Sequence, residues 1–377
     1  MIETPGILYS IGAFLLVIGP LVFVHEMGHY LVARWFNTKV EKFSIGFGRE
    51  IAGWTDKNDT RWKIGWLPLG GYVQFAGDLN AASQPDPDAE KIPSDQRAEL
   101  FQFKPVGQRF LIILAGPMIN FLFAIVLFMG IFATYGQAQN APIVSMIFED
   151  SVAEEAGFEL GDEITAVDGR SIDRFDELAD YVRLRPGQEM EFTIDRDGSN
   201  ISLIAETADI TVEDRFGNEA RIGRLGIQSD VLEMEQLGAT ELPSAAVAQT
   251  ISSLEMITVG LGQIISGRRS VEELGGPLRI AQYSGQTASL GLYAFLFFMA
   301  AISINLGFIN LLPIPMLDGG HLVFYAAEAV RRRPVKPEAQ EWAFRMGLAV
   351  LLSFMLMVTV IDLGSFGLWE RLSGLIG

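Results

Sequence analysis

The strongest indication of the fold of this chain is the stretch ILYSIGAFLLVIGPLVFVHEMGHYLVARWF, residues 7–36. Its first part, residues 7–24, carries no charge and is about long enough to cross a hydrocarbon core of roughly 30 Å. No basic segment precedes this run and no A-x-A cleavage site follows it, so the pattern favours a retained transmembrane helix over a signal peptide. The apolar helical pattern continues as far as Trp35, which also favours a retained helix. The motif HEMGH at 25–29 follows the uncharged run directly and so lies at the end of the membrane span.

HEMGH is an H-E-x-x-H match. On a helix, His25 and His29 share one face, with their Cβ atoms about 5–6 Å apart. Two neutral imidazoles at this spacing can hold zinc, with Glu26 beside the bound water. An ionisable group inside a membrane costs about 2.5–3.5 kcal/mol on insertion scales, which favours a functional role for Glu26. The alternative is a metal-free pair of interfacial histidines, and it is weak in a chain with only 3 histidines.

A catalytic zinc usually takes three protein ligands, and the chain has no cysteine to supply the third. The candidates lie in LDGGH at 317–321, which offers Asp318 and His321 just after a second apolar run. Pro313 and Pro315 break the helix there, and irregular backbone at membrane depth is tolerated only inside protein or beside a watery cavity. Asp318 is either a metal ligand or the N-cap of the next helix. The residue spacing alone leaves both roles open.

Four uncharged or nearly uncharged apolar runs predict four transmembrane helices, at 7–24, 110–134, 290–312 and 346–361. A further segment, 245–266, contains a glutamate, two glutamines and several hydroxyls, with apolar residues at helical spacing. That pattern is typical of a helix lying along the membrane surface, although a fifth span is the alternative.

Charge is distributed unevenly along the chain. Six of the seven lysines lie between the first two runs, and the seventh lies in the sequence RRRPVK at 331–336. Both loops fall on the same side of a four-span protein, and basic loops favour the cytoplasm. The segment 136–289 has 28 acidic residues against 11 arginines, a balance of −17 in a chain whose net charge is −18. We therefore expect an acidic, water-facing domain on the other side of the membrane.

Composition also excludes one class of partner. The 46 acidic residues outnumber the 28 basic ones, so nucleic-acid binding is not expected.

Within the acidic segment, residues 141–207 alternate short strand patterns with turns and one helical pattern at DRFDELADYVRLR. A transporter with an intramembrane proton relay would leave this domain without a role, and no inverted repeat supports it.

Several motifs together resemble one known family. HEMGH at 25–29 and NLLPIPMLDGGH at 310–321 resemble the site-2 protease family of intramembrane zinc metalloproteases. SIGFG, LPLGGYV and LAGPMIN, at 44–48, 67–73 and 114–120, resemble its bacterial RseP branch, and residues 151–169 resemble that branch's PDZ domain. The resemblance extends over nearly the entire chain. One departure is that the branch often has two tandem PDZ domains, whereas this chain has room for one, followed by a short β extension at 208–229.

The resemblance implies a set of site residues. His25, His29 and Asp318 would bind Zn²⁺, and Glu26 would be the catalytic base. Residues that would contact substrate are Asn305, Asn310, Gly70 and Gly71. The segment 61–77 would form a re-entrant β-hairpin that offers its edge to the substrate.

The implied fold is a polytopic α-helical membrane protein of about four transmembrane helices, with a re-entrant β-hairpin and one inserted extracytoplasmic PDZ domain. The expected divisions are the first transmembrane helix with HExxH (1–36), a cytoplasmic-side loop with the hairpin (37–105), the second transmembrane helix (106–136), the PDZ domain with its β extension (137–230), amphipathic interfacial helices (231–289), the third transmembrane helix with the LDG motif (290–325), and a basic loop with the fourth transmembrane helix (326–377).

The implied activity is zinc-dependent cleavage of transmembrane segments of pre-trimmed single-pass proteins, such as anti-sigma factors, and also of remnant signal peptides. The implied location is the bacterial inner membrane, where the lipid bilayer surrounds a multi-pass protein. The PDZ domain would be periplasmic and the active site would lie towards the cytoplasm. The alternative function is a membrane-anchored PDZ receptor or chaperone with a non-catalytic metal site.

Overall fold

The computed structural model describes residues 5–365, except 79–96, 214–218, 269 and 272–274. The chain divides into two compact units. Unit 1 combines Met1–Ile131 with Thr240–Gly377, and unit 2 is Phe132–Ala239.

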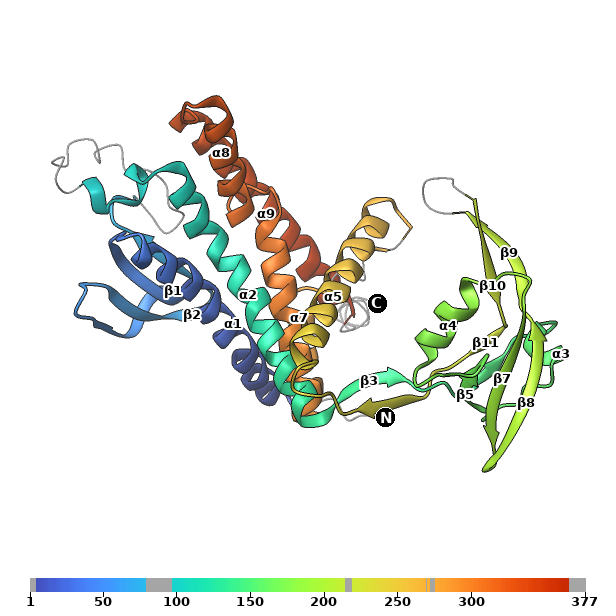
Figure 1. Cartoon of the computed structure of the whole chain (residues 1–377). Helices are drawn as coiled ribbons and strands as arrows, with labels where there is room; N and C mark the ends of the chain where they lie inside the picture. The colour runs from blue at the N-terminus through green and yellow to red at the C-terminus, as the bar shows by residue number, and fades with distance from the viewer. Residues whose placement is uncertain (1–4, 79–96, 214–218, 269, 272–274, 366–377) are drawn as a thin grey trace, which may run out of the picture. The chain divides into compact units, whose positions relative to one another are not determined.

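Unit 1 is mainly helical (Figure 1). Its helices are α1 (Ile7–Trp35), α2 (Val106–Tyr135, whose last turn falls in unit 2), α5 (Leu242–Ile265), α6 (Pro277–Ser289), α7 (Leu292–Leu311), α8 (Asp318–Arg331) and α9 (Pro337–Ser365). Two short 3-10 turns, Arg97–Glu99 and Phe101–Phe103, precede α2.

Four of the described helices are long and apolar enough to cross a membrane: Ile7–Trp35, Val106–Tyr135, Leu292–Leu311 and Glu338–Gly364. This confirms the prediction of four spans. Large apolar side chains point outward from these helices, with Leu16 of α1 and Val126 of α2 more than 60% exposed. Such exposure is typical of helices surrounded by lipid. The helix α5 is not among the described candidates, and its interfacial position stays a prediction.

The chain breaks between α7 and α8, as Pro313 and Pro315 predict. Met316 adopts a positive φ of 84°, and Leu317 is the N-cap residue of α8 without a side-chain capping bond. Asp318 is thus the first residue inside α8.

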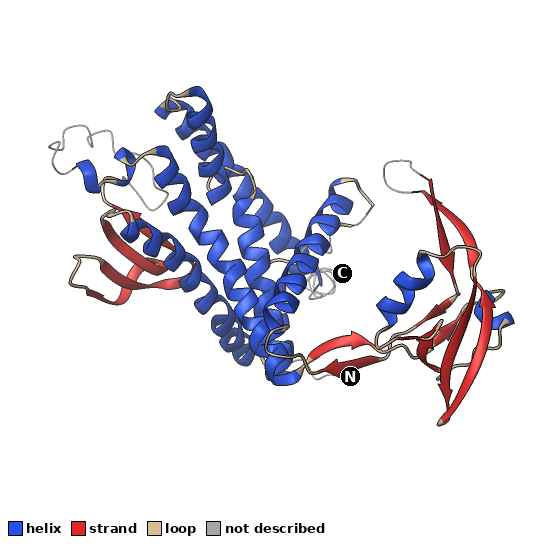
Figure 2. Cartoon of the chain, viewed as in Figure 1, coloured by secondary structure: helices blue, strands red, loops and turns tan. Residues whose placement is uncertain are grey.

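A small antiparallel sheet adjoins α1 in unit 1 (Figure 2). Its strands are β1 (Val40–Thr55) and β2 (Arg61–Phe75), and both bend sharply. Ile45 pairs with both Gly71 and Ile64, so the sheet has four segments in the order 71–75, 40–45, 61–64 and 52–55. The prediction that 61–77 forms the hairpin was therefore too narrow, because this segment supplies only one of two bent strands.

Unit 2 is built mainly of strands (Figure 2). A four-stranded sheet has the order β6-β5-β7-β8, with β5 at Glu163–Val167, β6 at Arg170–Ser171, β7 at Glu189–Arg196 and β8 at Ser199–Glu206. Three further pairs are β3 (Gln137–Asn140) with β12 (Leu232–Glu235), β4 (Met146–Ile147) with β11 (Ile227–Gln228), and β9 (Ala208–Glu213) with β10 (Glu219–Arg224). The helices are α3 (Val152–Glu155) and α4 (Phe175–Arg183).

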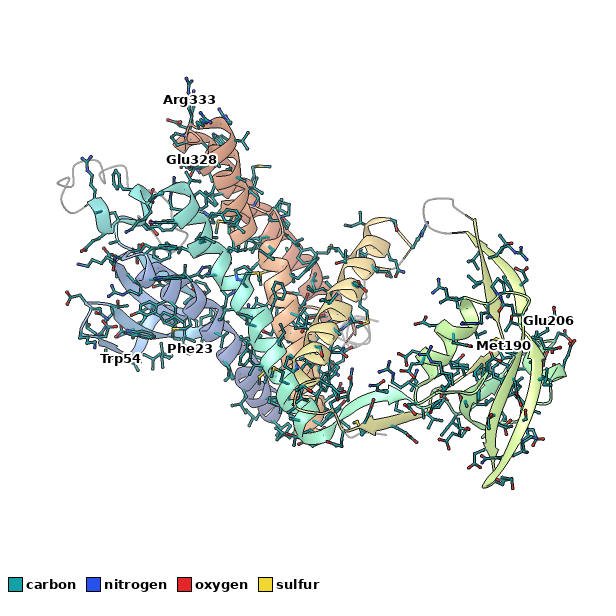
Figure 3. All side chains as sticks on the ribbon, in the orientation of Figure 1. Phe23, Trp54, Met190, Glu206, Glu328 and Arg333 are labelled. Carbon is teal, nitrogen blue, oxygen red and sulfur yellow. The ribbon has the colours of Figure 1, made fainter. Side chains whose placement is uncertain are left out.

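Alternation along the strands of unit 2 separates core from surface. Met190 of β7 is buried among the core side chains, whereas Glu206 of β8 lies at the surface (Figure 3). An ion pair between the buried Asp162 and the partly exposed Arg196 connects β7 to the turn before β5, because both Asp162 carboxylate oxygens accept hydrogen bonds of 2.7 Å from Arg196. Burial alone would raise the pKa of Asp162, but the bonds from Arg196 and from the Glu159 N–H outweigh it and lower this pKa.

Candidate metal centre

Three side chains from α1 and α8 bring their ligand atoms together. His25 Nε2 lies 3.3 Å from His29 Nε2, and Asp318 Oδ2 lies 3.2 Å and 3.5 Å from these two nitrogens. Zinc bonds of about 2.0–2.1 Å place neighbouring ligand atoms of a tetrahedron about 3.3 Å apart. The three distances therefore match three corners of a zinc tetrahedron.

The donor chemistry also fits a cation. Both histidines are more than 90% buried, and Asp318 Oδ2 is buried without a hydrogen-bond partner in the described part of the chain. A buried carboxylate oxygen without a partner is costly unless something positive satisfies it. Two imidazole nitrogens and one carboxylate oxygen form a common ligand set of catalytic zinc, with the fourth position left open.

Local sequence explains how Asp318 reaches the histidines. A Cβ at Gly319 would lie 2.1 Å from the Leu312 carbonyl oxygen, and one at Gly320 would lie 2.6 Å from that of Ile314. Only glycine allows the first turn of α8 to pack this tightly against the backbone that leaves α7. The two glycines of the LDGG motif therefore place Asp318 beside α1.

The second ring nitrogen of His29 has a fixed partner. His29 Nδ1 lies 2.9 Å from the carbonyl oxygen of Ile112 on α2, which can only accept a hydrogen bond. The proton of the neutral ring is therefore on Nδ1, and the lone pair of Nε2 faces Asp318 and His25. This is the tautomer that a metal ligand requires.

A cavity of about 280 Å³ opens beside these ligands. It is lined by the three ligand residues together with Glu26, Gly70, Gly71, Tyr72, Val73, Asn310, Met316, His321 and a few apolar side chains. Glu26 is 7% exposed and accepts a hydrogen bond from the backbone N–H of Val73. The carboxylate thus lies between the ligand cluster and the edge of the sheet.

The structure locates each residue predicted for the site. Asn310, Gly70 and Gly71 line the cavity, whereas Asn305 is not among its described lining residues. His321 also faces the cavity, but its ring packs 4.9 Å from the ring of Phe344 and is not in the ligand cluster.

Two features of the site were not predicted from the sequence. One is the Val73 N–H that binds Glu26, and the other is the Ile112 carbonyl that orients His29. Both are backbone groups, so no residue type signals them. They become visible only when the pairing of the sheet and the packing of α2 on α1 are known.

Comparisons with known proteins agree with this geometry. The family model described as peptidase family M50 matches residues 13–354. The chain is 42% identical over 374 residues to "Putative zinc metalloprotease R01501" of Rhizobium meliloti, covering 98% of each protein. It is 40% identical over 369 residues to "Putative zinc metalloprotease Atu1380" of Agrobacterium fabrum, covering 97% of this chain and 96% of that protein.

The chain is also 36% identical over 396 residues to "Metalloprotease MmpA" of Caulobacter vibrioides, covering 98% of this chain and 99% of that protein.

Among solved structures, the PDZ domain of the SdrC-like protein of Listeria monocytogenes matches 24% of this chain and 88% of its own length, with 21% identity and a TM-score of 0.20. The PDZ prediction for unit 2 depends on its sequence. The family model and the nearly full-length relatives show that the chain belongs to peptidase family M50, the site-2 protease family, and is a metalloprotease.

Proposed function

We propose that this metalloprotease uses zinc to cut peptide bonds inside the transmembrane segments of single-pass proteins that another protease has already trimmed. The observation that carries the proposal is the position of the ligand cluster. His25 and His29 lie within a candidate membrane span, and the cavity beside them is bordered by a sheet edge. A peptide bond must reach this depth to be cut.

The residues of the cavity have distinct roles in this proposal. Zinc held by His25, His29 and Asp318 would supply a Lewis acid that polarises the scissile carbonyl and makes a water more acidic. Glu26 accepts the proton of the attacking water and passes it to the leaving amine. The side-chain amide of Asn310 donates a hydrogen bond to the oxygen on which negative charge develops.

The sheet edge offers a way to hold an unwound substrate. A helical substrate hides each carbonyl in a hydrogen bond to the residue four positions later, so it must open locally before it can be cut. Segment 71–75 pairs with 40–45 on one side, and residues 71–73 line the cavity. An extended substrate strand that added to this edge would lie beside Glu26.

Exposed aromatic and apolar side chains support insertion of this sheet into the membrane, as the re-entrant prediction requires. Trp54 is 58% exposed (Figure 3), Trp66 is 61% exposed and Ile51 is 69% exposed. Tryptophan is enriched where protein meets the membrane interface.

We further propose how the two units and the active site lie relative to the membrane. Residues 137–230 form a PDZ domain with a β extension on the periplasmic side of the bacterial inner membrane, and the helices α5 and α6 within 231–289 lie at the membrane interface. The active site lies towards the cytoplasm, as the lysine distribution indicates. Anti-sigma-like proteins and remnant signal peptides are the proposed substrates, by family resemblance.

Cleavage of a trimmed single-pass substrate by the purified, zinc-loaded full chain tests the proposal. We expect products whose masses place the cut inside the transmembrane segment, and we expect Glu26→Gln to abolish them while zinc remains bound. Cleavage only outside the membrane segment, or unchanged cleavage by Glu26→Gln, would contradict it. Binding of the substrate without any cleavage would instead favour the PDZ receptor or chaperone.

A further inference from the structure

One face of α2 contacts both histidines of the candidate metal centre. Residues Ile112, Gly116 and Asn120 are spaced by four and share this face. The Ile112 carbonyl binds His29 Nδ1, and a Cβ at Gly116 would lie 2.2 Å from His29 Nε2. One turn further on, Asn120 Nδ2 lies 3.0 Å from His25 Nδ1.

Asn120 is an unusual residue for its position. Its side chain is 0% exposed and lies within the uncharged run 110–134. The backbone carbonyl of Asn120 accepts a 2.8 Å hydrogen bond from Ser303 of α7, but its side-chain Oδ1 has no partner in the described part of the chain. A buried polar group left without a partner destabilises the folded state, so its presence needs a reason.

Metal binding supplies that reason. If His25 binds the metal through Nε2, its proton must be on Nδ1, and Nδ1 then needs a hydrogen-bond acceptor. The acceptor on Asn120 is Oδ1, and a half-turn of the amide exchanges Oδ1 with Nδ2, which has nearly the same size. In one orientation Oδ1 lacks a partner, and in the other Nδ2 lacks one. The number of hydrogen bonds is therefore the same in both orientations. The metal decides between them.

We propose that Asn120 is a positioning residue whose Oδ1 accepts the Nδ1 proton of His25 and so holds the Nε2 lone pair towards the metal. This inference depends on the metal site of the proposed function. The helix α2 then provides a hydrogen-bond acceptor to each histidine. His29 is held by the backbone carbonyl of Ile112, and His25 is held by the side chain of Asn120. Only the second contact can be removed by substitution.

The test measures zinc affinity by chelator competition on the metal-stripped full chain in detergent. Asn120→Leu and the smaller Asn120→Ala both remove the acceptor, and we expect each to weaken the affinity about 10–100-fold, the usual effect of losing an outer partner of a metal ligand. Asn120→Asp keeps the acceptor and forms a carboxylate–histidine pair, so it should retain the affinity. Ser303→Ala is the matched control, because the Ser303 hydroxyl donates its hydrogen bond to the backbone carbonyl of Asn120 and the substitution leaves the Asn120 amide in place, so it should also retain the affinity.

Three outcomes would overturn the inference or its basis. If Asn120→Leu and Asn120→Ala bind zinc as tightly as the wild type, Asn120 does not position His25. If Asn120→Asp loses as much affinity as Asn120→Leu, the contribution of Asn120 is packing and the inference is wrong. If the wild type binds no zinc, or Asp318→Asn binds it equally well, the metal site of the proposed function is itself wrong, which is a separate failure. Thermal unfolding of the metal-free variants separates lost affinity from lost folding.

Discussion

Gly71 lies where the sheet edge meets the proposed catalytic base, and Gly71→Ala should slow catalysis without removing the metal. A Cβ at this position would lie 2.9 Å from Glu26 Cγ, 2.7 Å from Val22 Cγ1 and 2.7 Å from the Ser44 carbonyl oxygen. Carbon atoms in contact normally lie about 3.5–4.0 Å apart. Ser44 is itself in the sheet and its carbonyl cannot retreat far, so the added methyl group pushes mainly on α1.

The size of the effect follows from these distances. Restoring an ordinary contact requires Glu26 and the new methyl group to separate by about 0.6–1.1 Å. A misplacement of about 1 Å in an active site costs on the order of 100-fold in rate, which corresponds to about 2.7 kcal/mol of activation free energy. The three nearest atoms to the new Cβ belong to no proposed metal ligand, so zinc content should stay at the wild-type level.

The assay is kcat for cleavage of a trimmed single-pass substrate, measured together with zinc content. Gly19→Ala is a matched control, because it adds the same methyl group to α1 where nothing lies within 4 Å. An unchanged kcat for Gly71→Ala would refute the argument, since the sheet edge would then yield without moving Glu26. Loss of zinc together with activity would refute it as well, because the damage would have reached the ligands.

Three further predictions concern the metal, the topology and acid stability. Asp318→Asn should sharply lower zinc occupancy in metal analysis, whereas His321→Ala should leave it unchanged; the reverse result would reassign the third ligand. A cysteine introduced by Ser199→Cys into this cysteine-free chain should react with an impermeant maleimide from outside intact cells, and labelling only after lysis would invert the topology. Because the folded-state pKa of Asp162 is lowered, its ion pair with Arg196 stabilises unit 2 above about pH 4, and this stability is lost as the pH falls through the lower folded value. The protection factors of the amides in β5 and β7, which are corrected for the intrinsic exchange rate at each pH, should therefore fall in acid, and Asp162→Asn should flatten this pH dependence while lowering the protection at neutral pH.

The membrane helices were predictable because their signal is local. An uncharged run of about 20 residues has few alternatives to a membrane span. Three of the predicted runs fall within an observed helix, and the run 290–312 extends only one or two residues beyond the ends of α7. The i,i+4 spacing of His25 and His29 is equally local, and it brings their Nε2 atoms to 3.3 Å. The family membership followed from motifs of the same local kind, and the comparisons confirm it.

Features that depend on distant partners were not predictable. Segment 137–140 has the sequence QAQN, which carries no alternating apolar pattern, and it becomes a strand because it pairs with 232–235. The bends of β1 and β2 require residues such as Gly46 and Gly70 at positive φ, and neither glycine indicates which segments pair across the bend. Asp318 shows the same limit, because its spacing alone suited a ligand and a helix cap equally.

Asn120 shows how far a sequence can point towards such a partner. It is the only residue with a side-chain amide in the uncharged run 110–134. Lipid cannot satisfy an amide, so a polar side chain in a membrane helix has to find its partner in the protein. The sequence therefore marks Asn120 as a residue that must contact something polar on another helix, but it leaves open whether that is Ser303, Asn310 or a histidine. The packing of α2 on α1 decides the question: Gly28 and Gly116 let the two helices approach closely, and this approach brings the amide to the ring of His25. Contacts thus run from Ser303 through Asn120 to His25. On our proposal, removing the Asn120 amide weakens metal binding by His25, although Asn120 is not itself a ligand.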